Sequence, residues 1–437
     1  MNIRFHTLGC KVNQYETQAM MAMMAGDGAD VGEFLPGDDG ARCADVLVIN
    51  SCTVTAESDR KLRQLLRRCR RDNPQALLVL TGCMPQAFPE KAALLTEADI
   101  VMGNANRRAL ADRIRLHAEG RRCVDIAPHH ANYESLHIGE FQGRTRAFVK
   151  IEDGCNRFCS YCIIPYARGR VRSRPLAELR RELAALAENG YREAVLVGIN
   201  LTSYGQDCGL TIADAVEAAA TVPGIERIRL GSLEPDHMTP ALIERLAAQS
   251  KLCPQFHLSL QSGCDATLRR MNRHYTAAEY AQVCARLREA FPGCSLTTDI
   301  MVGFPGEDGT EFEESLAFAR SIGFLQAHVF AYSRRPGTPA AKAPDQVAQT
   351  EKAARSRRMT AACGEERDRQ LNALLGRQAE ILLETRTQDG LLEGYTPTYV
   401  PVYCETAASP GELVVCRITG RRGDACVGRD IRFQKKY

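Results

Sequence analysis

The stretch KIEDGCNRFCSYCIIPYARGRVRSR, residues 150–174, carries the chemistry around which the rest of the chain is organised. It contains Cys155, Cys159 and Cys162, separated by three and by two residues. Three thiolates at this spacing fit one corner of a cubane iron–sulfur cluster and leave the fourth iron without a protein ligand. An open coordination position is a mark of catalytic rather than structural metal sites. The stretch therefore predicts a catalytic cluster on a loop that follows an apolar strand.

Two other uses of these cysteines fit less well. A zinc site needs a fourth Cys or His nearby, and the next histidine after the triplet is His257. A disulfide leaves one thiol unpaired and requires an oxidising compartment. The spacing resembles the signature of the radical S-adenosylmethionine (SAM) enzymes.

Length and composition bound the remaining possibilities. A chain of 437 residues predicts two or three domains. Because the net charge is only +3, any affinity for nucleic acid must come from local basic patches and not from the whole surface. The 18 cysteines are too dilute for a disulfide scaffold of this size. The start MNIRFHTLGC predicts a strand and no signal peptide, and no apolar run approaches the ~20 residues of a membrane span. We expect a cytoplasmic protein with reduced thiols and no membrane association.

The first part of the chain alternates apolar runs with helical patterns. Strands are predicted at residues 3–8, 45–50, 76–81 and 99–102, and helices at about 14–24, 56–71 and up to 95. Short apolar runs separated by helices predict an open parallel sheet that is covered on both faces. Cys10, Cys52 and Cys83 each follow a predicted strand. Because parallel strands end at the same edge, where such sheets bind ligands, we expect these three to converge.

The three other cysteines before residue 155 precede a strand, lie in a helix and lie in a connector, and are interpreted as core residues: Cys43, Cys69 and Cys123. The helix predicted at 57–72 carries seven cations: Arg60, Lys61, Arg63, Arg67, Arg68, Arg70 and Arg71. Such a run is either a solvated face or a set of phosphate contacts, and the sequence leaves both open.

A second alternating segment begins after an irregular connector at 120–141. Strands are predicted at 147–152, 193–198, 227–235, 255–263, 295–306 and 325–333. A helix follows each, at 176–188, 212–220, 240–248, 277–290, 310–321 and from 349 onward. Six such units predict a partial (β/α)6 barrel with its chemistry on loops at the carboxyl ends of the strands.

The loops of this barrel supply candidate contacts for a cofactor and a substrate. Gly198, Glu234, Gln261 and Asp299 follow predicted strands and combine close backbone approach with groups that could hold an amino group or a ribose. Ordinary turn chemistry is the alternative. Arg168, Arg170, Arg172 and Arg174 come directly after the cysteine loop. Their spacing of two predicts one face of an extended segment, a basic rim suited to RNA or to an anionic cluster.

The composition changes after about residue 376. Short alternating runs broken by Gly, Pro and Asp predict a small antiparallel β-barrel. Its end is basic, with Arg421, Arg422, Arg429, Arg432, Lys435 and Lys436. Such an end fits nucleic-acid binding, whereas a stabilising cap is the alternative.

The motifs together resemble the radical SAM methylthiotransferase family over essentially the whole chain. They are TLGCKVNQYET (7–17), NSCTVT (50–55), TGCMPQ (81–86), GCNRFCSYCIIPYARG (154–169) and HLSLQSGCDATLRRMNR (257–273). The resemblance implies a methylthiotransferase N-terminal domain at 1–120, a radical SAM core at 141–371 and a TRAM RNA-binding domain at 374–437.

The resemblance also implies two 4Fe–4S clusters and SAM as cofactors. Cys10, Cys52 and Cys83 would hold an auxiliary cluster that supplies sulfur, and Cys155, Cys159 and Cys162 the catalytic cluster that cleaves SAM. The resulting 5′-deoxyadenosyl radical would remove hydrogen from carbon 2 of an adenine, and a second SAM would supply the methyl group. Gly198, Glu234, Gln261 and Asp299 remain the candidates for SAM contact.

Within the family, TLGCKVNQYE resembles the branch that acts on N6-threonylcarbamoyladenosine at position 37 of tRNA. The implied partners are a tRNA anticodon stem-loop, an external electron donor and a sulfur source. Methylthiolation of isopentenyladenosine 37 or of a ribosomal-protein aspartate is the alternative within the family. Two other classes are weighed: a non-catalytic iron–sulfur RNA-binding protein and a disulfide-bearing extracellular protein.

Overall fold

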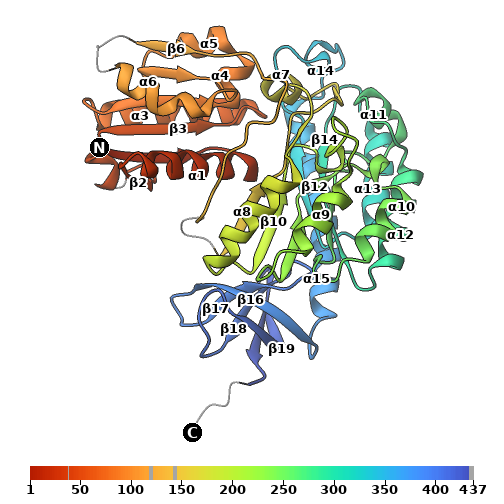
Figure 1. Cartoon of the computed structure of the whole chain (residues 1–437). Coiled ribbons are helices and arrows are strands. Elements are labelled where there is room, and N and C mark those ends of the chain that lie inside the picture. The colour runs from red at the N-terminus through yellow and green to blue at the C-terminus, as the bar shows by residue number, and fades with distance from the viewer. Residues whose placement is uncertain (38, 118–121, 141–144, 433–437) are drawn as a thin grey trace.

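The computed structural model describes residues 1–37, 39–117, 122–140 and 145–432 (Figure 1). An α/β layer, a larger half-open α/β barrel and a small β-barrel follow one another along the chain, from red through green to blue. The predicted domain limits at residues 120, 141 and 437 lie outside the described residues, as do Lys435 and Lys436.

Six parallel strands form the N-terminal sheet in the order β2-β1-β3-β4-β5-β6. They are β1 (Asn2–Thr7), β2 (Asp30–Glu33), β3 (Val46–Ser51), β4 (Leu77–Gly82), β5 (Ile100–Met102) and β6 (Cys123–Asp125). The helices are α1 (Lys11–Gly26), α2 (Asp39–Arg42), α3 (Ala56–Asp72), α4 (Cys83–Ala87), α5 (Pro89–Ala93) and α6 (Leu110–Leu116), with the 3₁₀ turn η1 (Arg107–Ala109).

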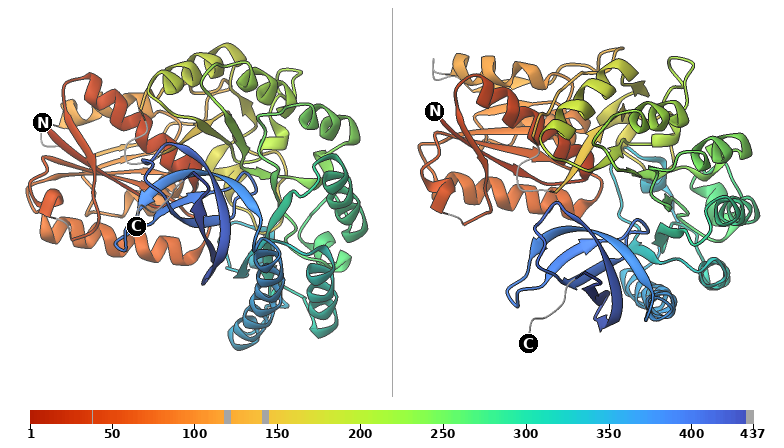
Figure 2. Two further views of the ribbon diagram at one scale, coloured as in Figure 1. Left: turned by 90° about the horizontal axis from the view of Figure 1, so that it is seen from below. Right: turned by 60° about the horizontal axis from the view of Figure 1, so that its bottom comes forward.

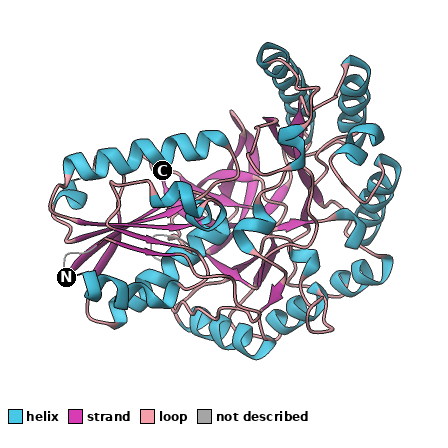
Figure 3. Cartoon of the chain, turned by 90° about the horizontal axis from the view of Figure 1, so that it is seen from above, coloured by secondary structure: helices cyan, strands magenta, loops and turns pink. Residues whose placement is uncertain are grey.

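Helices cover both faces of this sheet (Figure 3). Val48 in β3 packs in the same core as Met20 of α1, whereas its neighbour Ile49 packs with Leu62 of α3. Since both faces are buried, β3 and β4 each begin with four consecutive apolar residues, which is why their runs could be recognised in the sequence. The edge strands β2 and β6 were not predicted, because they are short and only partly buried.

The central part confirms the partial barrel of six βα units. Its strands are β7 (Arg146–Lys150), β8 (Glu152–Asp153), β9 (Arg172–Ser173), β10 (Glu193–Val197), β11 (Arg227–Leu230), β12 (Ser232–Leu233), β13 (Gln255–Leu258), β14 (Ser295–Val302) and β15 (Gln326–Ala331). The strand predicted at 227–235 is divided at Gly231, so that the parallel strands form the sheets β11-β10-β7 and β12-β13-β14-β15.

Helices cover the outside of this half-open barrel (Figure 3). They are α7 (Ile164–Arg168), α8 (Leu176–Glu188), α9 (Ile212–Ala220), α10 (Pro240–Ala247), α11 (Asp265–Arg270), α12 (Ala277–Ala290), α13 (Gly309–Ile322), α14 (Pro339–Lys342) and α15 (Gln349–Asn372), with the turns η3 (Leu201–Ser203) and η4 (Pro235–His237). None of the helices in the described part of the chain is both long and apolar enough to cross a membrane.

The C-terminal strands close into a barrel in the order β16-β17-β18-β20-β19. They are β16 (Gln378–Arg386), β17 (Leu392–Tyr395), β18 (Pro401–Glu405), β19 (Leu413–Arg422) and β20 (Ala425–Asp430). The β18–β20 pairing is parallel, and the other four pairings are antiparallel. This barrel lies under the central part in the view of Figure 1, and in the view from below it stands in front of the junction between the N-terminal sheet and the central part (Figure 2). Arg227 at the start of β11 pairs with Glu380 at 2.7 Å and so joins the two parts.

Candidate active site

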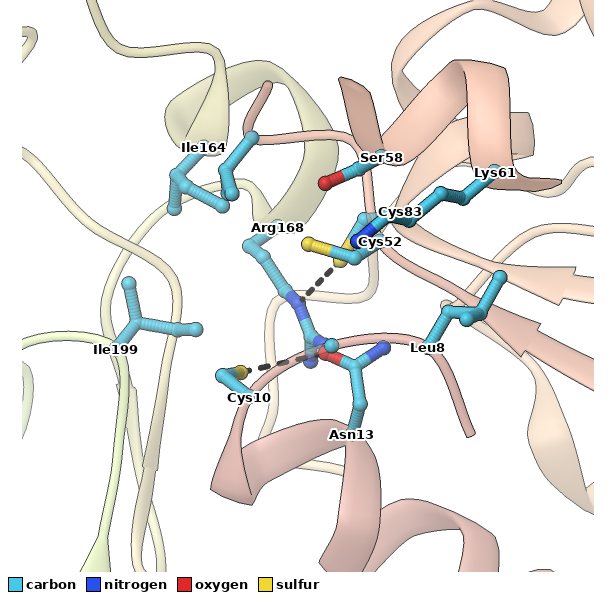
Figure 4. Close-up of a pocket in the computed structure, with 12 residues that line it drawn as sticks. Leu8, Cys10, Asn13, Cys52, Ser58, Lys61, Cys83, Ile164, Arg168 and Ile199 are labelled. Carbon is cyan, nitrogen blue, oxygen red and sulfur yellow. Dashed lines mark hydrogen bonds between the residues drawn. The ribbon is translucent and has the colours of Figure 1, made fainter. Parts of the chain in front are cut away.

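The structure brings Cys10, Cys52 and Cys83 together at the edge of the N-terminal sheet. Each follows a strand, β1, β3 or β4, and all three line one cavity of about 460 Å³ (Figure 4). We call this space the three-cysteine cavity. Ile164 and Ile199 of the central part line its other side. The cavity therefore opens between the N-terminal sheet and the barrel.

Two of these thiols are buried, and the third is exposed. Burial raises the pKa of Cys52 to about 12. Burial also raises the pKa of Cys83, and the charge of Arg168 acts in the opposite direction on that pKa. The Nε of Arg168 donates a hydrogen bond to the Sγ of Cys83 at 3.2 Å. A thiolate in this position thus has a fixed cation beside it, as an anionic cluster requires.

The arginines after residue 167 do not form the predicted basic rim. Arg168 is the last residue of helix α7, and Arg168, Arg172 and Arg174 are buried, whereas Arg170 is exposed. Arg174 pairs with Glu182, which is also buried. The spacing of two misled the prediction because the segment is not extended throughout and because its acidic partners come from other elements, among them Glu16 in α1, 152 residues before Arg168.

Arg168 belongs to a cluster of buried charges that joins the N-terminal sheet to the barrel. Its cations are Arg107, Lys150, Arg168 and Arg172, and its acids are Glu16, Glu134 and Asp153. We call these seven residues the buried ion cluster. With four cations and three acids it carries one excess positive charge, which faces the three-cysteine cavity through Arg168.

The loop that carries Cys155, Cys159 and Cys162 is fixed by its backbone. Gly154 has a φ of 85°, and a Cβ there would lie 1.9 Å from the carbonyl oxygen of Arg170, so only glycine fits this close approach. The next amide, that of Cys155, donates to the carbonyl of Gly169 at 3.0 Å. On the other side, the Nη1 of Arg273 donates to the Sγ of Cys159 at 3.4 Å.

The donor set fits a cluster at both triplets. Burial raises the pKa of Cys155 and of Cys162 to about 12, so these thiols need a strong cationic partner to lose their protons. All 18 cysteines are free thiols in this structure. Among the described residues no three His, Cys, Asp or Glu side chains are placed as around a single metal ion. A cubane instead offers a separate iron to each cysteine.

A second cavity, of about 310 Å³, lies inside the barrel, and we call it the barrel cavity. Gly198 and Asp299 line it, together with His257, His328 and Cys10 among others. Asp299 lies 3.4 Å from the Nε2 of His257. Because Cys10 lines both cavities, the barrel cavity adjoins the three-cysteine cavity.

The other candidate contacts lie in different surroundings. A Cβ on Gly198 would lie 2.6 Å from a carboxylate oxygen of Glu152, so this glycine is also required for packing. Glu234 pairs with Arg273 at 2.5 Å. Gln261 has a φ of 66°, and its Oε1 is buried without a hydrogen-bond partner. An unpartnered buried acceptor fits a donor from a ligand.

Sequence reasoning missed Lys11 and Tyr399, which line the barrel cavity. Lys11 is next to Cys10 in the TLGCKVNQYET motif, which was a usable signal. Tyr399 comes from the β17–β18 loop of the C-terminal barrel and has a φ of 66°. Although burial works to raise it, the pKa of Tyr399 is lowered by the charges of Arg146, Lys11 and Arg229. No pattern in the sequence predicts that this loop enters the active site.

The basic surfaces are partly neutralised. In helix α3 most arginines have acidic partners, whereas Lys61 and Arg63 are exposed and Lys61 lines the three-cysteine cavity. At the C-terminal end the four described arginines pair with acids: Arg421 with Asp368, Arg422 with Asp389, Arg429 with Glu405 and Arg432 with Asp430. The predicted basic end is therefore less positive than its composition indicates.

Comparison with known proteins agrees with this architecture. Residues 149–319 match the Radical SAM superfamily, and residues 2–103 match the Uncharacterized protein family UPF0004. The chain is similar in fold to the radical SAM methyltransferase TsrM from Kitasatospora setae, with a TM-score of 0.59 over 78% of this chain and 75% of that one. The sequence identity is 16%, so this likeness concerns the fold alone.

Relatives of known name align over nearly the whole chain. Two are called threonylcarbamoyladenosine tRNA methylthiotransferase MtaB. The one from Thermotoga maritima is 35% identical over 91% of this chain and 90% of its own, and the one from Bacillus subtilis is 37% identical over 95% and 93%. A tRNA-2-methylthio-N(6)-dimethylallyladenosine synthase from Pelotomaculum thermopropionicum is 35% identical over 90% and 86%. The predicted family is confirmed: this chain belongs to the radical SAM methylthiotransferases, a family whose fold and chemistry imply a 4Fe–4S cluster and SAM.

Proposed function

We propose that this enzyme adds a methylthio group to carbon 2 of N6-threonylcarbamoyladenosine at position 37 of tRNA. The observation that carries the proposal is the meeting of the two cavities at Cys10, which brings a three-cysteine site next to the lumen of a radical SAM barrel. The names of the Thermotoga and Bacillus relatives support this nucleoside as the substrate.

We assign a 4Fe–4S cluster to each cysteine triplet: Cys155, Cys159 and Cys162 for the catalytic cluster, and Cys10, Cys52 and Cys83 for the auxiliary one. When bound, the clusters and SAM supply the electron, the radical chemistry, the sulfur and the methyl group. The proposed domains are an N-terminal auxiliary-cluster domain at 1–120, a radical SAM core at 141–371 and a TRAM domain at 374–437.

The chain's own residues hold and shield these groups. Arg168 and Arg273 each donate a hydrogen bond to a cysteine sulfur and so offset negative charge. Ile164 and Ile199 form an apolar wall of the three-cysteine cavity that limits the entry of water. The unpartnered Oε1 of Gln261 is suited to accept a hydrogen bond from SAM, and Gly198, Glu234 and Asp299 remain candidate contacts.

The proposed partners follow from the surface. An anticodon stem-loop would approach over α3, where Lys61 lines the three-cysteine cavity and Arg63 is exposed on the same helix. An external electron donor and a sulfur source would complete the reaction, and we propose that the enzyme acts on tRNA in the cytoplasm. Isopentenyladenosine 37 is the second candidate, because a relative of that specificity is also 35% identical.

Mass spectrometry of nucleosides tests the proposal. Reconstituted enzyme with SAM, reductant and sulfide is incubated with tRNA that carries either modification at position 37. We expect methylthiolation of threonylcarbamoyladenosine and not of isopentenyladenosine; the reverse result would refute the substrate but leave the family unchanged.

Two triple variants test the cluster assignment. Replacement of Cys155, Cys159 and Cys162 by alanine should leave about half the iron, if both clusters are cubanes. The same change at Cys10, Cys52 and Cys83 should also halve the iron and should abolish methylthiolation while SAM cleavage continues. Unchanged iron in either variant would exclude that site.

A further inference from the structure

The barrel cavity is lined by a lysine that has no acidic partner among the described residues. Lys11, the first residue of α1, lines the cavity, and its ammonium lies 5.9 Å from the ring centroids of both Phe148 and Tyr399. Within the described ranges, no acid forms an ion pair or hydrogen bond with it. Glu193, whose charge acts on Lys11, accepts a hydrogen bond from Arg229 at 2.8 Å instead.

Four buried arginines around the candidate site already have acidic partners. Arg168 pairs with Glu16, Arg174 with Glu182, Arg273 with Glu234 and Arg229 with Glu193. An acidic ligand would have to break a buried ion pair to reach any of these four, which leaves an uncompensated charge and is costly. Lys11 can accept an acidic partner without that loss.

The rest of the barrel cavity has a mixed lining of polar and apolar residues, and among the described residues no second lysine and no arginine lines it. Asp299 lies on its wall beside His257, and the His257 and His328 rings are 6.1 Å apart. A volume of about 310 Å³ lies at the lower limit for a small-molecule pocket, enough for a compact polar group. Tyr399 lines the cavity as well, and Arg146 and Arg229 lie 5.1 and 4.7 Å from its ring centroid.

The threonylcarbamoyl group has a carboxylate and a hydroxyl, whereas an isopentenyl group is entirely apolar. We propose that Lys11 binds the carboxylate of the threonylcarbamoyl group in the barrel cavity, with Tyr399 of the C-terminal barrel beside it. This inference rests on the proposed function and makes Lys11 a determinant of specificity. It also places a residue of the C-terminal barrel in contact with the modified base.

The test is a comparison of binding by anticodon stem-loop RNAs. Their position 37 carries threonylcarbamoyladenosine, its carboxyl methyl ester or unmodified adenosine. The proteins are the reconstituted enzyme, Lys11→Met, Lys11→Arg and, as a matched control, Lys342→Met, which removes an exposed lysine at the end of α14. Iron content and circular dichroism of each variant are measured first, because Lys11 adjoins Cys10.

Because the proposed contact of Lys11 with the carboxylate is a charge-assisted hydrogen bond, we expect wild type and Lys342→Met to bind the acid RNA about tenfold or more tightly than the methyl-ester RNA. Lys11→Met should bind both equally, and Lys11→Arg should keep most of the preference. A preference retained in Lys11→Met, or none in wild type, would overturn the inference. Should Lys11→Met lose iron, Lys11→Gln replaces it under the same criteria. Failure of the wild type to methylthiolate threonylcarbamoyladenosine would refute the proposed function instead, whatever the binding data show.

Discussion

Replacing Glu16 by glutamine should break the ion pairs that join the N-terminal sheet to the central barrel and so lower the free energy of unfolding. Glu16 is fully buried in α1 and lies 2.7 Å from the Nη2 of Arg107, 2.7 Å from the Nζ of Lys150 and 3.0 Å from the Nη2 of Arg168. Arg107 belongs to the N-terminal part, and the two other cations belong to the barrel. Glutamine keeps the shape and removes the charge, so the buried ion cluster would change from four cations and three acids to four and two.

The cost of breaking a buried ion pair and the pKa shift of Glu16 give the same loss of unfolding free energy. Removing one partner from a buried ion pair costs about 3–5 kcal/mol. Although burial works to raise it, the charges of Arg107, Arg168 and Lys150 lower the pKa of Glu16 from 4.5 to about 2. That shift corresponds to about 3 kcal/mol of stability. Since the folded-state pKa is the lower one, this contribution is complete above pH 4.5 and is lost as the pH falls towards 2.

The assay is urea unfolding of wild type and Glu16→Gln at pH 6 and pH 8. We expect the variant to lose about 3 kcal/mol of unfolding free energy, equally at both pH values. The matched control is Glu57→Gln, at an exposed acid paired with Arg60, which should unfold at nearly the same urea concentration as wild type. Adding Lys150→Met to Glu16→Gln should restore part of the loss, because it lowers the excess positive charge of the cluster from two to one, the wild-type value. A loss below 1 kcal/mol, or no recovery in the double variant, would refute the reasoning.

Three further predictions concern other contacts. Arg273→Met removes a hydrogen bond to the Sγ of Cys159, so the reduction potential of the loaded cluster should fall by about 60 mV or more, as followed by EPR during a redox titration. The double change Lys61→Ala with Arg63→Ala should weaken tRNA binding and reduce its salt slope by about 1–2, as measured by binding at several salt concentrations. Arg229→Met removes the partner of a buried glutamate and two bonds to the β17–β18 loop, so stability should fall by about 3 kcal/mol in urea unfolding and limited proteolysis should cleave this loop sooner.

Each of these has an outcome that contradicts it. An unchanged potential in Arg273→Met would mean that the hydrogen bond is replaced in the loaded enzyme. For RNA binding, Arg421→Ala with Arg422→Ala is the control, because both arginines already have acidic partners. A larger effect there than at α3 would move the RNA surface to the C-terminal barrel. Equal protease sensitivity of Arg229→Met and wild type would show that other contacts hold the loop.

Local patterns predicted the parts of the fold that are apolar and periodic. The six barrel strands and their helices follow from alternation of short apolar runs with helical segments, and β3 and β4 were predicted because both of their faces are buried. The division at Gly231 was not predictable, since it depends on which neighbour each half pairs with. Edge strands such as β2 lack the apolar run on which such a prediction depends.

The candidate site shows the same division between local and long-range information. The position of Cys10, Cys52 and Cys83 after strands was enough to predict their convergence, because parallel strands end at one edge. The partners of the arginines were not predictable, because Glu16 is 152 residues from Arg168 in the sequence. A run of arginines looks alike whether its charges are neutralised or free, and only the folded structure distinguishes the two.

The C-terminal barrel packs against the central part and also contributes Tyr399 to the lining of the barrel cavity. Deleting it near residue 376 is a poor test of RNA binding, since the deletion would also strip Glu380 from Arg227 and Tyr399 from Arg229. The deletion would expose Arg227 and Arg229, two arginines of β11 that are buried in the intact protein, and their loss of packing would disturb the barrel cavity itself. A substitution confined to Tyr399 separates the two roles. Tyr399→Ala leaves the ion pair of Arg227 in place, so weaker discrimination between acid and ester RNA in that variant would come from the cavity and not from a detached barrel.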